Sequence, residues 1–166
     1  MTTTTATAHG QLEALLNLHV QLSRPFEVLG DAPEGARVNC SIAAGRFEGP
    51  RLRGTLRTLG GEWFTLRRDG VGVLDVRCTL QTDDGALILA EHGGLVDFGE
   101  TGHADLLSGQ LPDRRTAGVA VRYHTAHPAY TWLNRTQVVG WASVDLQEAS
   151  VDYQLFTLSA RPVEPA

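Results

Sequence analysis

The sequence contains no lysine, because all 14 of its basic side chains are arginines. A protein without lysine cannot form a Schiff base with a carbonyl substrate, attach pyridoxal phosphate covalently or use the lysine of a phosphate-binding P-loop. The chain is also acidic overall, with a formal net charge of -5. This charge argues against nucleic acids and anionic membrane surfaces as partners.

Long apolar segments are missing as well, since no run approaches the roughly 18 residues that a membrane helix needs. Residues 1–10 are rich in threonine and alanine and lack the basic and apolar parts of a signal peptide. We therefore expect a polar N-terminal tail over residues 1–10, one domain over residues 11–166 and a cytoplasmic location. Cys40 and Cys78 lie in apolar patterns, which predicts buried thiols. A disulfide between them is the alternative if neighbouring strands bring the two residues face to face.

Sequence motifs of common enzyme classes are absent, including GxSxG, HExxH, CxxC, the Walker loop and the dinucleotide-binding glycine pattern. The six histidines do not show the close spacing of metal ligands, although a pair from separate strands would escape this test. The sequence therefore predicts neither a metal nor a cofactor.

Apolar and polar residues alternate with a period of two along most of the chain, which is typical of strands. Residues 16–22 follow this pattern, although a helix is the alternative there because residues 12–16 are also apolar. Turns are predicted at residues 30–35, 45–50 and 60–61, and the irregular segment 94–116 is predicted to hold one helical turn near 104–107. The predicted strands number about nine and cover residues 16–22, 37–44, 51–59, 63–68, 73–82, 86–93, 117–125, 135–146 and 151–161.

Nine short strands without a repeat or a linker predict an all-β fold. Closure of the sheet removes exposed strand edges, which would otherwise promote aggregation. We expect a single closed, mostly antiparallel β-barrel with a long, lid-like loop and at most short helical turns.

Polar residues on the predicted strand faces are the candidates for chemistry. Asp75 and Arg77 are two residues apart and therefore share one face of a strand. If that face is the lumen, the carboxylate and the guanidinium could act in catalysis or anchor a ligand. If it is the exterior, the two residues form a surface ion pair. Glu62 and His92 are further candidates for moving a proton, although a surface position would explain His92 equally well.

Aromatic side chains cluster in the predicted corner over residues 126–134, and Trp63 lies on the strand that follows residues 60–61. Such aromatics either plug the end of a barrel or line a pocket for flat, unsaturated ligands. We predict a substrate-binding role for Trp63, Tyr123, His124, Tyr130 and Trp132, and Asn134 joins Asp75, Arg77, Glu62 and His92 as a catalytic candidate.

An ordered series of short segments resembles the DUF3237 family, also called UPF0311. The segment 45–54 is similar to the family's GG-F-GP-L-G pattern, with Ala44 in place of the first glycine. Glu62 stands where the family often has aspartate, which puts a shared role for this carboxylate in doubt. The other matching segments are 60–63, 68–70, 74–77, 82–85, 130–134, residue 140 and 151–153.

The resemblance implies a calycin-like barrel, and barrels of this kind in secondary metabolism include enzymes that catalyse cyclisations without a cofactor. On this basis we predict a cofactor-independent enzyme that binds an apolar or polyketide-like intermediate and directs a cyclisation, isomerisation or related rearrangement. The alternative is a non-catalytic, lipocalin-like carrier or sensor of small ligands. Association into a homo-oligomer is expected because remaining strand edges and apolar patches are often buried in symmetric assemblies.

Overall fold

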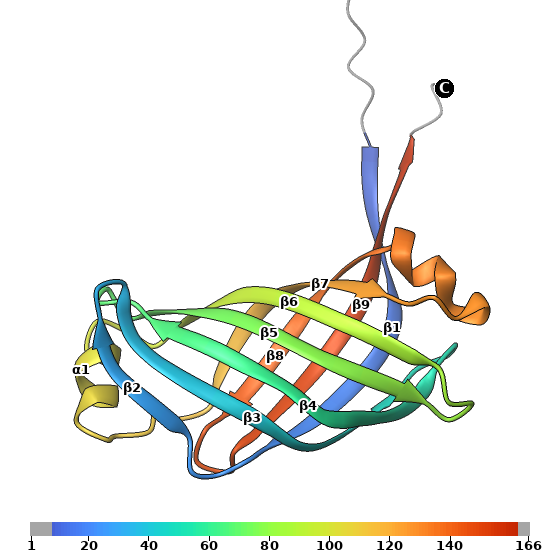
Figure 1. The fold of residues 1–166 in the computed structure, drawn as a ribbon. Coiled ribbons are helices and arrows are strands. Elements are labelled where there is room, and N and C mark those ends of the chain that lie inside the picture. The colour runs from blue at the N-terminus through green and yellow to red at the C-terminus, as the bar shows by residue number, and fades with distance from the viewer. Residues whose placement is uncertain (1–7, 163–166) are drawn as a thin grey trace, which may run out of the picture.

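The structure is a computed structural model, and it describes residues 8–162 of the chain. Nine strands run antiparallel to their neighbours and form one sheet that curves around a single core (Figure 1). The strands are β1 (Ala8–Leu22), β2 (Glu27–Ala32), β3 (Gly35–Glu48), β4 (Arg53–Leu66), β5 (Val71–Thr82), β6 (Leu87–Asp97), β7 (Arg115–His124), β8 (Gln137–Asp145) and β9 (Ser150–Pro162). The predicted closed, all-β barrel is confirmed.

The barrel closes because β1 pairs on both of its edges. Its partners are β9 on one side and β3 on the other, where Asn17 lies opposite Glu48 and Leu22 opposite Ile42. Eight strands therefore form the closed ring, and β2 adds an extra strand to the other half of β3. Closure in this way leaves an interior that is just wide enough to be filled by side chains.

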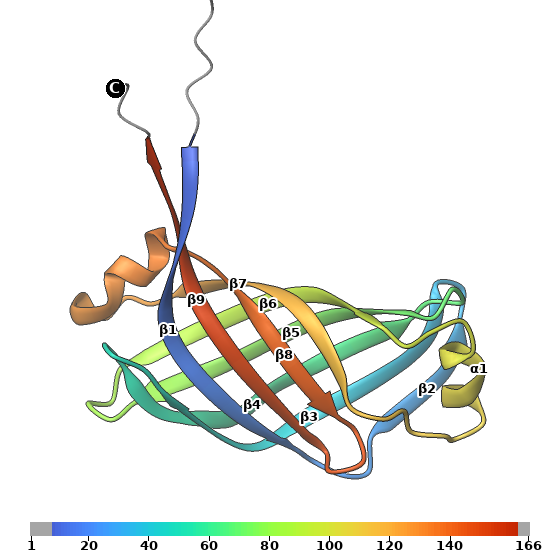
Figure 2. The ribbon, with the colours of Figure 1, turned by 180° about the vertical axis from the view of Figure 1, so that it is seen from behind.

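A two-stranded ribbon extends beyond the barrel where β1 and β9 outrun the other strands (Figures 1 and 2). The pairing of β1 with β9 runs from Ala8 opposite Pro162 to Gln21 opposite Ser150. The predicted polar tail over residues 1–10 lies mostly outside the described residues, and residues 8–10 already belong to β1. The expectation of a strand rather than a helix over residues 16–22 is confirmed.

The glycine doublet Gly60–Gly61 does not end a strand as predicted, because β4 runs through it. Pairing with β5 shifts register between Leu56 and Gly60, so the doublet follows a β-bulge. A side chain at Gly61 would bring its Cβ within 2.4 Å of the carbonyl oxygen of Cys40, so glycine allows β3 and β4 to approach closely here. Glycine within a strand often marks a bend or close approach of this kind.

Two further segments differ from the expected boundaries. Residues 45–48 continue β3 instead of turning, because this half of β3 pairs with β1. β2 was not predicted, and it occupies part of the expected turn over residues 30–35. The prediction of nine strands therefore agrees in number only, since two predicted strands merge into β4 and β2 replaces the one that is lost.

Short helices occupy opposite ends of the barrel (Figure 1). Helix α1 (Gly102–Leu107) lies in the long segment between β6 and β7, as predicted, and the 3-10 helix η1 (Pro128–Arg135) precedes β8. Neither helix is long and apolar enough to span a membrane, and this holds for the whole described part of the chain.

Candidate functional site

The interior of the barrel is apolar except for a small group of polar side chains at mid-height. Cys40, Glu62, Val76 and His92 are successive cross-strand partners on β3, β4, β5 and β6. Side chains directly opposite each other point to the same face of a sheet. All four therefore point into the lumen: Cys40, Val76 and His92 are buried, and Glu62 is partly buried with its Oε1 atom fully enclosed.

Glu62 is a buried carboxyl group without a partner. Its Oε1 atom is the one buried side-chain N or O atom between residues 8 and 162 that lacks a hydrogen-bond partner. Burial raises the pKa of Glu62 from 4.5 to about 7, and the negative charge of Asp75 contributes less. The group is thus placed to exist in both protonation states near neutral pH, which suits an acid or base.

Beside this carboxyl group, His92 and Tyr153 share a hydrogen bond across the lumen. His92 Nε2 lies 3.1 Å from the hydroxyl oxygen of Tyr153, and the two rings pack edge to face at 5.2 Å. Burial lowers the pKa of His92 to about 4. Burial also raises the pKa of Tyr153 well above its usual value, and the Glu62 charge raises it further. Both rings are therefore neutral at physiological pH.

Glu62, His92 and Tyr153 border one small internal cavity, which we call the polar niche. The space open to the centre of a water molecule there is about 20 Å³, enough for about one water. Cys78 also borders the niche, and burial raises the pKa of its thiol to about 12, so it stays protonated. The other walls are aliphatic side chains of β1, β3, β4, β5 and β9.

A second cavity, which we call the apolar chamber, lies on the α1 side of Glu62. It measures about 60 Å³ by the same definition, and Glu62 is its one ionisable carboxyl group. Glu62 therefore borders both cavities. The remaining walls are almost entirely apolar and include Phe26, Phe64, Leu74, Phe98, Leu106 and Leu111.

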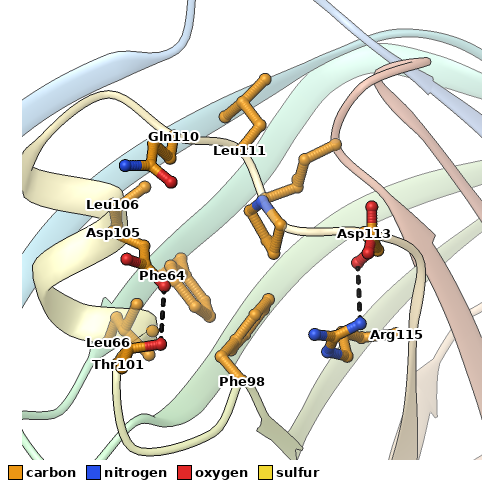
Figure 3. A pocket seen from close by; sticks show the side chains of 13 residues that line it. Phe64, Leu66, Phe98, Thr101, Asp105, Leu106, Gln110, Leu111, Asp113 and Arg115 are labelled. Atoms are coloured by element: carbon orange, nitrogen blue, oxygen red, sulfur yellow. Dashed lines mark hydrogen bonds between the residues drawn. The ribbon is translucent and has the colours of Figure 1, made fainter.

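The apolar chamber adjoins a surface cleft of about 230 Å³ beside α1 (Figure 3). Phe64, Phe98, Leu106 and Leu111 line both spaces. The rings of Phe64 and Phe98 pack edge to face with their centroids 5.8 Å apart. These four side chains close the barrel at the α1 end, so a movement of the 98–114 segment would join the cleft to the chamber.

Asp75 and Arg77 lie on the outer face of β5, and the prediction of a pair in the lumen is wrong. Their side chains are about half exposed and lie 3.4 Å apart, and Arg77 also contacts Glu91 at 3.3 Å. Trp63 is exposed on the outside as well, with the Arg77 guanidinium 5.9 Å from its ring. Its predicted position in a pocket is therefore also wrong. The exterior ion pair is the alternative that the structure supports.

The corner residues are not in the site either. Asn134 is exposed and bridges the backbone of Thr125, accepting from its N–H and donating to its carbonyl oxygen. Tyr130 donates to Asp84, and the Arg51 guanidinium stacks 3.6 Å from the ring of Trp132.

Tyr123 and His124, the last two residues of β7 before this corner, point to opposite sides of the strand. His124 faces outward, 3.5 Å from Glu91, whereas Tyr123 is buried in the core. The predicted catalytic role of Asn134 and the predicted pocket role of the aromatics thus lack support, because the corner closes the η1 end of the barrel.

Two predicted site residues, Glu62 and His92, do come together in the lumen, and the sequence analysis missed their neighbour Tyr153. A signal for it exists, because Val151, Tyr153 and Leu155 form an alternating apolar series that marks the inner face of β9. A hydroxyl in that series is a polar group directed into the core. Both cysteines are buried and unpaired, as their apolar surroundings indicated.

Within residues 8–162, no group of three His, Cys, Asp or Glu side chains is arranged to hold a metal ion.

Comparison with known proteins gives a family and a set of related folds. The sequence model described as "Protein of unknown function (DUF3237)" matches residues 10–158. A UPF0311 protein of Rhodopseudomonas palustris strain TIE-1 is 25% identical over 126 residues, which cover 74% of this chain and 82% of that protein.

Solved structures share the barrel. A "beta-barrel like protein" from Acinetobacter baumannii superposes with a TM-score of 0.76 and 32% identity, covering 91% of this chain and 97% of that one. A structure described as "an enzyme from Penicillium herquei" gives a TM-score of 0.64 at 22% identity, covering 94% and 98% of the two chains. At that identity the likeness shows the fold alone.

Proposed function

The chain belongs to the DUF3237 family, whose members are described as proteins of unknown function, and we propose that it is a cofactor-independent enzyme of small-molecule metabolism. It binds an apolar, polyketide-like intermediate of secondary metabolism in the barrel and directs a cyclisation, isomerisation or related rearrangement. The barrel neighbour from Penicillium herquei that is described as an enzyme supports catalysis on this fold.

The observation that carries the proposal is the unpaired carboxyl group of Glu62 between the apolar chamber and the polar niche. A buried polar atom without a partner costs stability, so a protein that only had to fold would gain by replacing it. An apolar carrier has no need of it. A proton-transfer catalyst does, because its acid or base must meet the substrate in a site that excludes water.

The lumen supplies two effects to such a reaction. Its walls fix the conformation of a flexible substrate, which lowers the entropic part of the barrier. Glu62, with a pKa of about 7, removes a proton from one atom of the substrate and returns it to another. A positioned acid or base of this kind contributes about 10²–10⁴-fold to a rate.

Access for such a substrate is through the α1 end. The apolar chamber, at about 60 Å³, holds only a small part of a polyketide-sized molecule. The adjoining cleft of about 230 Å³ lies on the other side of Phe64 and Phe98. Displacement of these rings with the 98–114 segment extends the chamber into the cleft, so the reacting end lies at Glu62 and the remainder lies under α1.

A non-catalytic carrier or sensor is the second candidate function. The position of Asp75 and Arg77 on the exterior favours it, because the lumen then has fewer charged groups than the enzyme hypothesis assumed. The apolar chamber would serve a carrier equally well. The two functions differ in whether the bound molecule leaves the barrel chemically changed.

The experiment compares the wild type with E62Q, using E91Q as the matched control. Glu91 is a partly exposed glutamate on the outer face of β6, one residue before His92, so the same substitution there leaves the lumen intact. Each protein is incubated with a lipid extract of the source organism, repurified and examined by native mass spectrometry. The retained molecules are then released and identified.

We expect E62Q to retain an unchanged small molecule that the wild type and E91Q convert into an isomer. Release of the same unchanged compound from all three proteins would establish the carrier and contradict catalysis. Failure of both the wild type and E62Q to retain or convert any small molecule would contradict both functions.

We also propose a cytoplasmic location, which suits two buried cysteines that remain unpaired.

A further inference from the structure

The polar niche has the size of a single oxygen atom or water molecule, at about 20 Å³. The polar side chains of Glu62, His92 and Tyr153 border it, together with the thiol of Cys78. The apolar chamber meets it at Glu62. A ligand that fills both spaces is apolar along its body and carries one small polar group at its inner end.

We propose that this group is a carbonyl oxygen held by Tyr153, so that the substrates are apolar carbonyl compounds that react at the carbon next to the carbonyl. This inference rests on the proposed function. In the arrangement we propose, the Nε2–H of His92 donates to the Tyr153 oxygen, and the hydroxyl hydrogen of Tyr153 donates to the ligand. A chain of hydrogen bonds in a dry site strengthens each donor.

The niche cannot suit a carboxylate, because Glu62 would place a second negative charge beside it in a buried site. A carbonyl group carries no charge until the reaction begins. Neutral donors that meet an oxygen as it gains negative charge stabilise the transition state more than the ground state. Tyr153 is such a donor, and Glu62 borders the same cavity.

The reaction step is a proton transfer. The Glu62 carboxylate takes a proton from the carbon next to the carbonyl, and the electrons of the broken C–H bond form a carbon–carbon double bond. The carbonyl electrons move to the oxygen, which accepts the hydrogen bond of Tyr153. Isomerisation occurs when the substrate carries a double bond one carbon further on, so that deprotonation gives a conjugated dienolate and Glu62 returns the proton to its far carbon, which moves the double bond next to the carbonyl. Cyclisation ends when the enolate carbon bonds to an electrophilic carbonyl carbon of the same molecule and Glu62 protonates the resulting alkoxide.

The test uses a medium-chain methyl ketone with an isotopically labelled carbonyl group as the probe. Infrared spectra of the bound ketone report the hydrogen bond to its oxygen without requiring a reaction. We expect the carbonyl band of the ketone bound to the wild type or to E62Q to lie at lower wavenumber than in a hydrocarbon solvent. In Y153F the band should return toward the hydrocarbon value. Y130F is the matched control, because Tyr130 lies outside the barrel against Asp84.

The same ketone in heavy water reports proton transfer through the exchange of its hydrogens for deuterium. We expect E62Q to slow exchange by at least 100-fold and Y153F to slow it by about 100-fold. If Y153F does not fold, fluorotyrosine labelling of the wild type tests the same contact, because a more acidic phenol shifts the carbonyl band further.

The outcomes separate the two proposals. Glu62-dependent exchange without a Tyr153-dependent band shift would overturn the carbonyl niche and leave the proposed catalysis standing. A Tyr153-dependent band shift without exchange would support the niche and contradict the proposed catalysis. Failure of the ketone to bind would overturn the niche.

A separate observation concerns the outer surface of β6–β9. Cross-strand pairing places Leu95, Gly118 and Trp141 in one outward row and Ala120, Val139 and Phe156 in the next. We call these six residues the uncharged face. Leu95 is 58% and Trp141 52% exposed, with Gly118 forming a depression between them.

The projecting ribbon continues this surface (Figure 2). At the base of the ribbon, where Leu158 also pairs with Gln137 of β8, Leu12 and Leu158 are cross-strand partners and are exposed by 52% and 43%. Residues 8–16 of β1 pair with β9 alone, so their other edge is open in the described structure. A two-stranded ribbon is only marginally stable on its own in water, so contact with a further surface would stabilise the outer part of this one.

We infer that a second copy of this chain covers the uncharged face and the ribbon. In a twofold dimer the same patch meets itself, and a patch without charges meets its copy without repulsion even though the chain carries a net charge of -5. The ribbon of each copy then lies over β7 and β8 of the other. A face that spans several strands and a ribbon can supply the roughly 800 Å² per partner of a standard interface.

Sedimentation analysis of the full chain tests this interface. We expect a dimer for the wild type, monomers for L95E and W141E, and a dimer for L59E. L59E is the matched control because Leu59 is an exposed leucine, 78% accessible, in the bulge of β4 away from the uncharged face. A monomeric wild type, a dimer that survives both L95E and W141E, or a monomer that instead floats with lipid vesicles would overturn the inference.

Discussion

The inner and outer faces of β4–β6 carry the same kind of residue in opposite chemical states. Glu62 points into the lumen without a hydrogen-bond partner for Oε1, whereas Asp75 points out from the next strand and pairs with Arg77. Asp75 directly precedes Val76, the cross-strand partner of Glu62. The two carboxyl groups are therefore close in the sheet, but one faces the lumen and the other faces solvent.

Water accounts for this difference. About half of the Asp75 side chain is exposed, so solvent stabilises its charge. Glu62 has no such solvation, and its charge is destabilised by the apolar walls that surround it. Because successive side chains of a strand point to opposite faces of the sheet, neighbouring residues can lie in two different environments. The following predictions test this contrast.

The largest expected effect is on the pH dependence of stability. The pKa of Glu62 is raised from 4.5 when unfolded to about 7 when folded. Its stabilising contribution is therefore complete below pH 4.5 and is lost as the pH rises through 7. Because E62Q cannot ionise, its free energy of unfolding relative to the wild type should increase by about 3 kcal/mol between pH 4 and pH 8.

Urea denaturation at a series of pH values measures this difference. E91Q is the matched control, because it makes the same substitution at a partly exposed position on the outer face. Parallel curves for E62Q and the wild type would show that Glu62 ionises in the folded protein as readily as in the unfolded chain.

A smaller effect is expected on the outer face. R77Q removes the guanidinium that pairs with Asp75 and Glu91. Exposed ion pairs contribute about 0–1 kcal/mol, so the free energy of unfolding at pH 7 should fall by less than about 1 kcal/mol. Thermal and urea denaturation both measure this change in the free energy of unfolding. A loss of several kcal/mol would mean that the outer network is shielded from water, contrary to the exposure of its members.

The smallest effect connects the two faces. The charge of Asp75 helps to raise the pKa of Glu62, after the larger effect of burial. D75N should therefore lower the pKa of Glu62 toward its ordinary value by a fraction of a unit. An infrared titration that follows the band of the protonated Glu62 carboxyl group measures this pKa. An increase in this pKa would contradict the proposed coupling through β5.

Most of the fold could be predicted from alternation, because closure of an eight-stranded barrel requires one apolar face on every strand. Leu74, Val76, Cys78 and Leu80 mark the inner face of β5 in this way. The boundaries of β4 could not be predicted, since glycine doublets end strands more often than they follow bulges. Only tertiary pairing with β3 and β5 keeps Gly60 and Gly61 inside the strand.

The site could be predicted only in part. Glu62 and His92 were identified as side chains that can move a proton and lie next to predicted strands. Asp75 and Arg77 attracted attention by their spacing, but alternation alone does not say which face is the lumen, although the apolar series on β5 points away from them. Tyr153 lies far from both in sequence, and only the pairing of β9 with β1 and β8 brings it to His92.

The double pairing of β1 has a consequence for synthesis. Its first partner, β3, leaves the ribosome soon after it, but β9 begins only at Ser150. One edge of β1 therefore stays unpaired until β9 has been synthesised, and the barrel cannot close before then. Pairing between such distant segments slows folding and leaves strand edges open to wrong partners. The nascent chain should therefore depend on ribosome-associated chaperones until β9 has emerged.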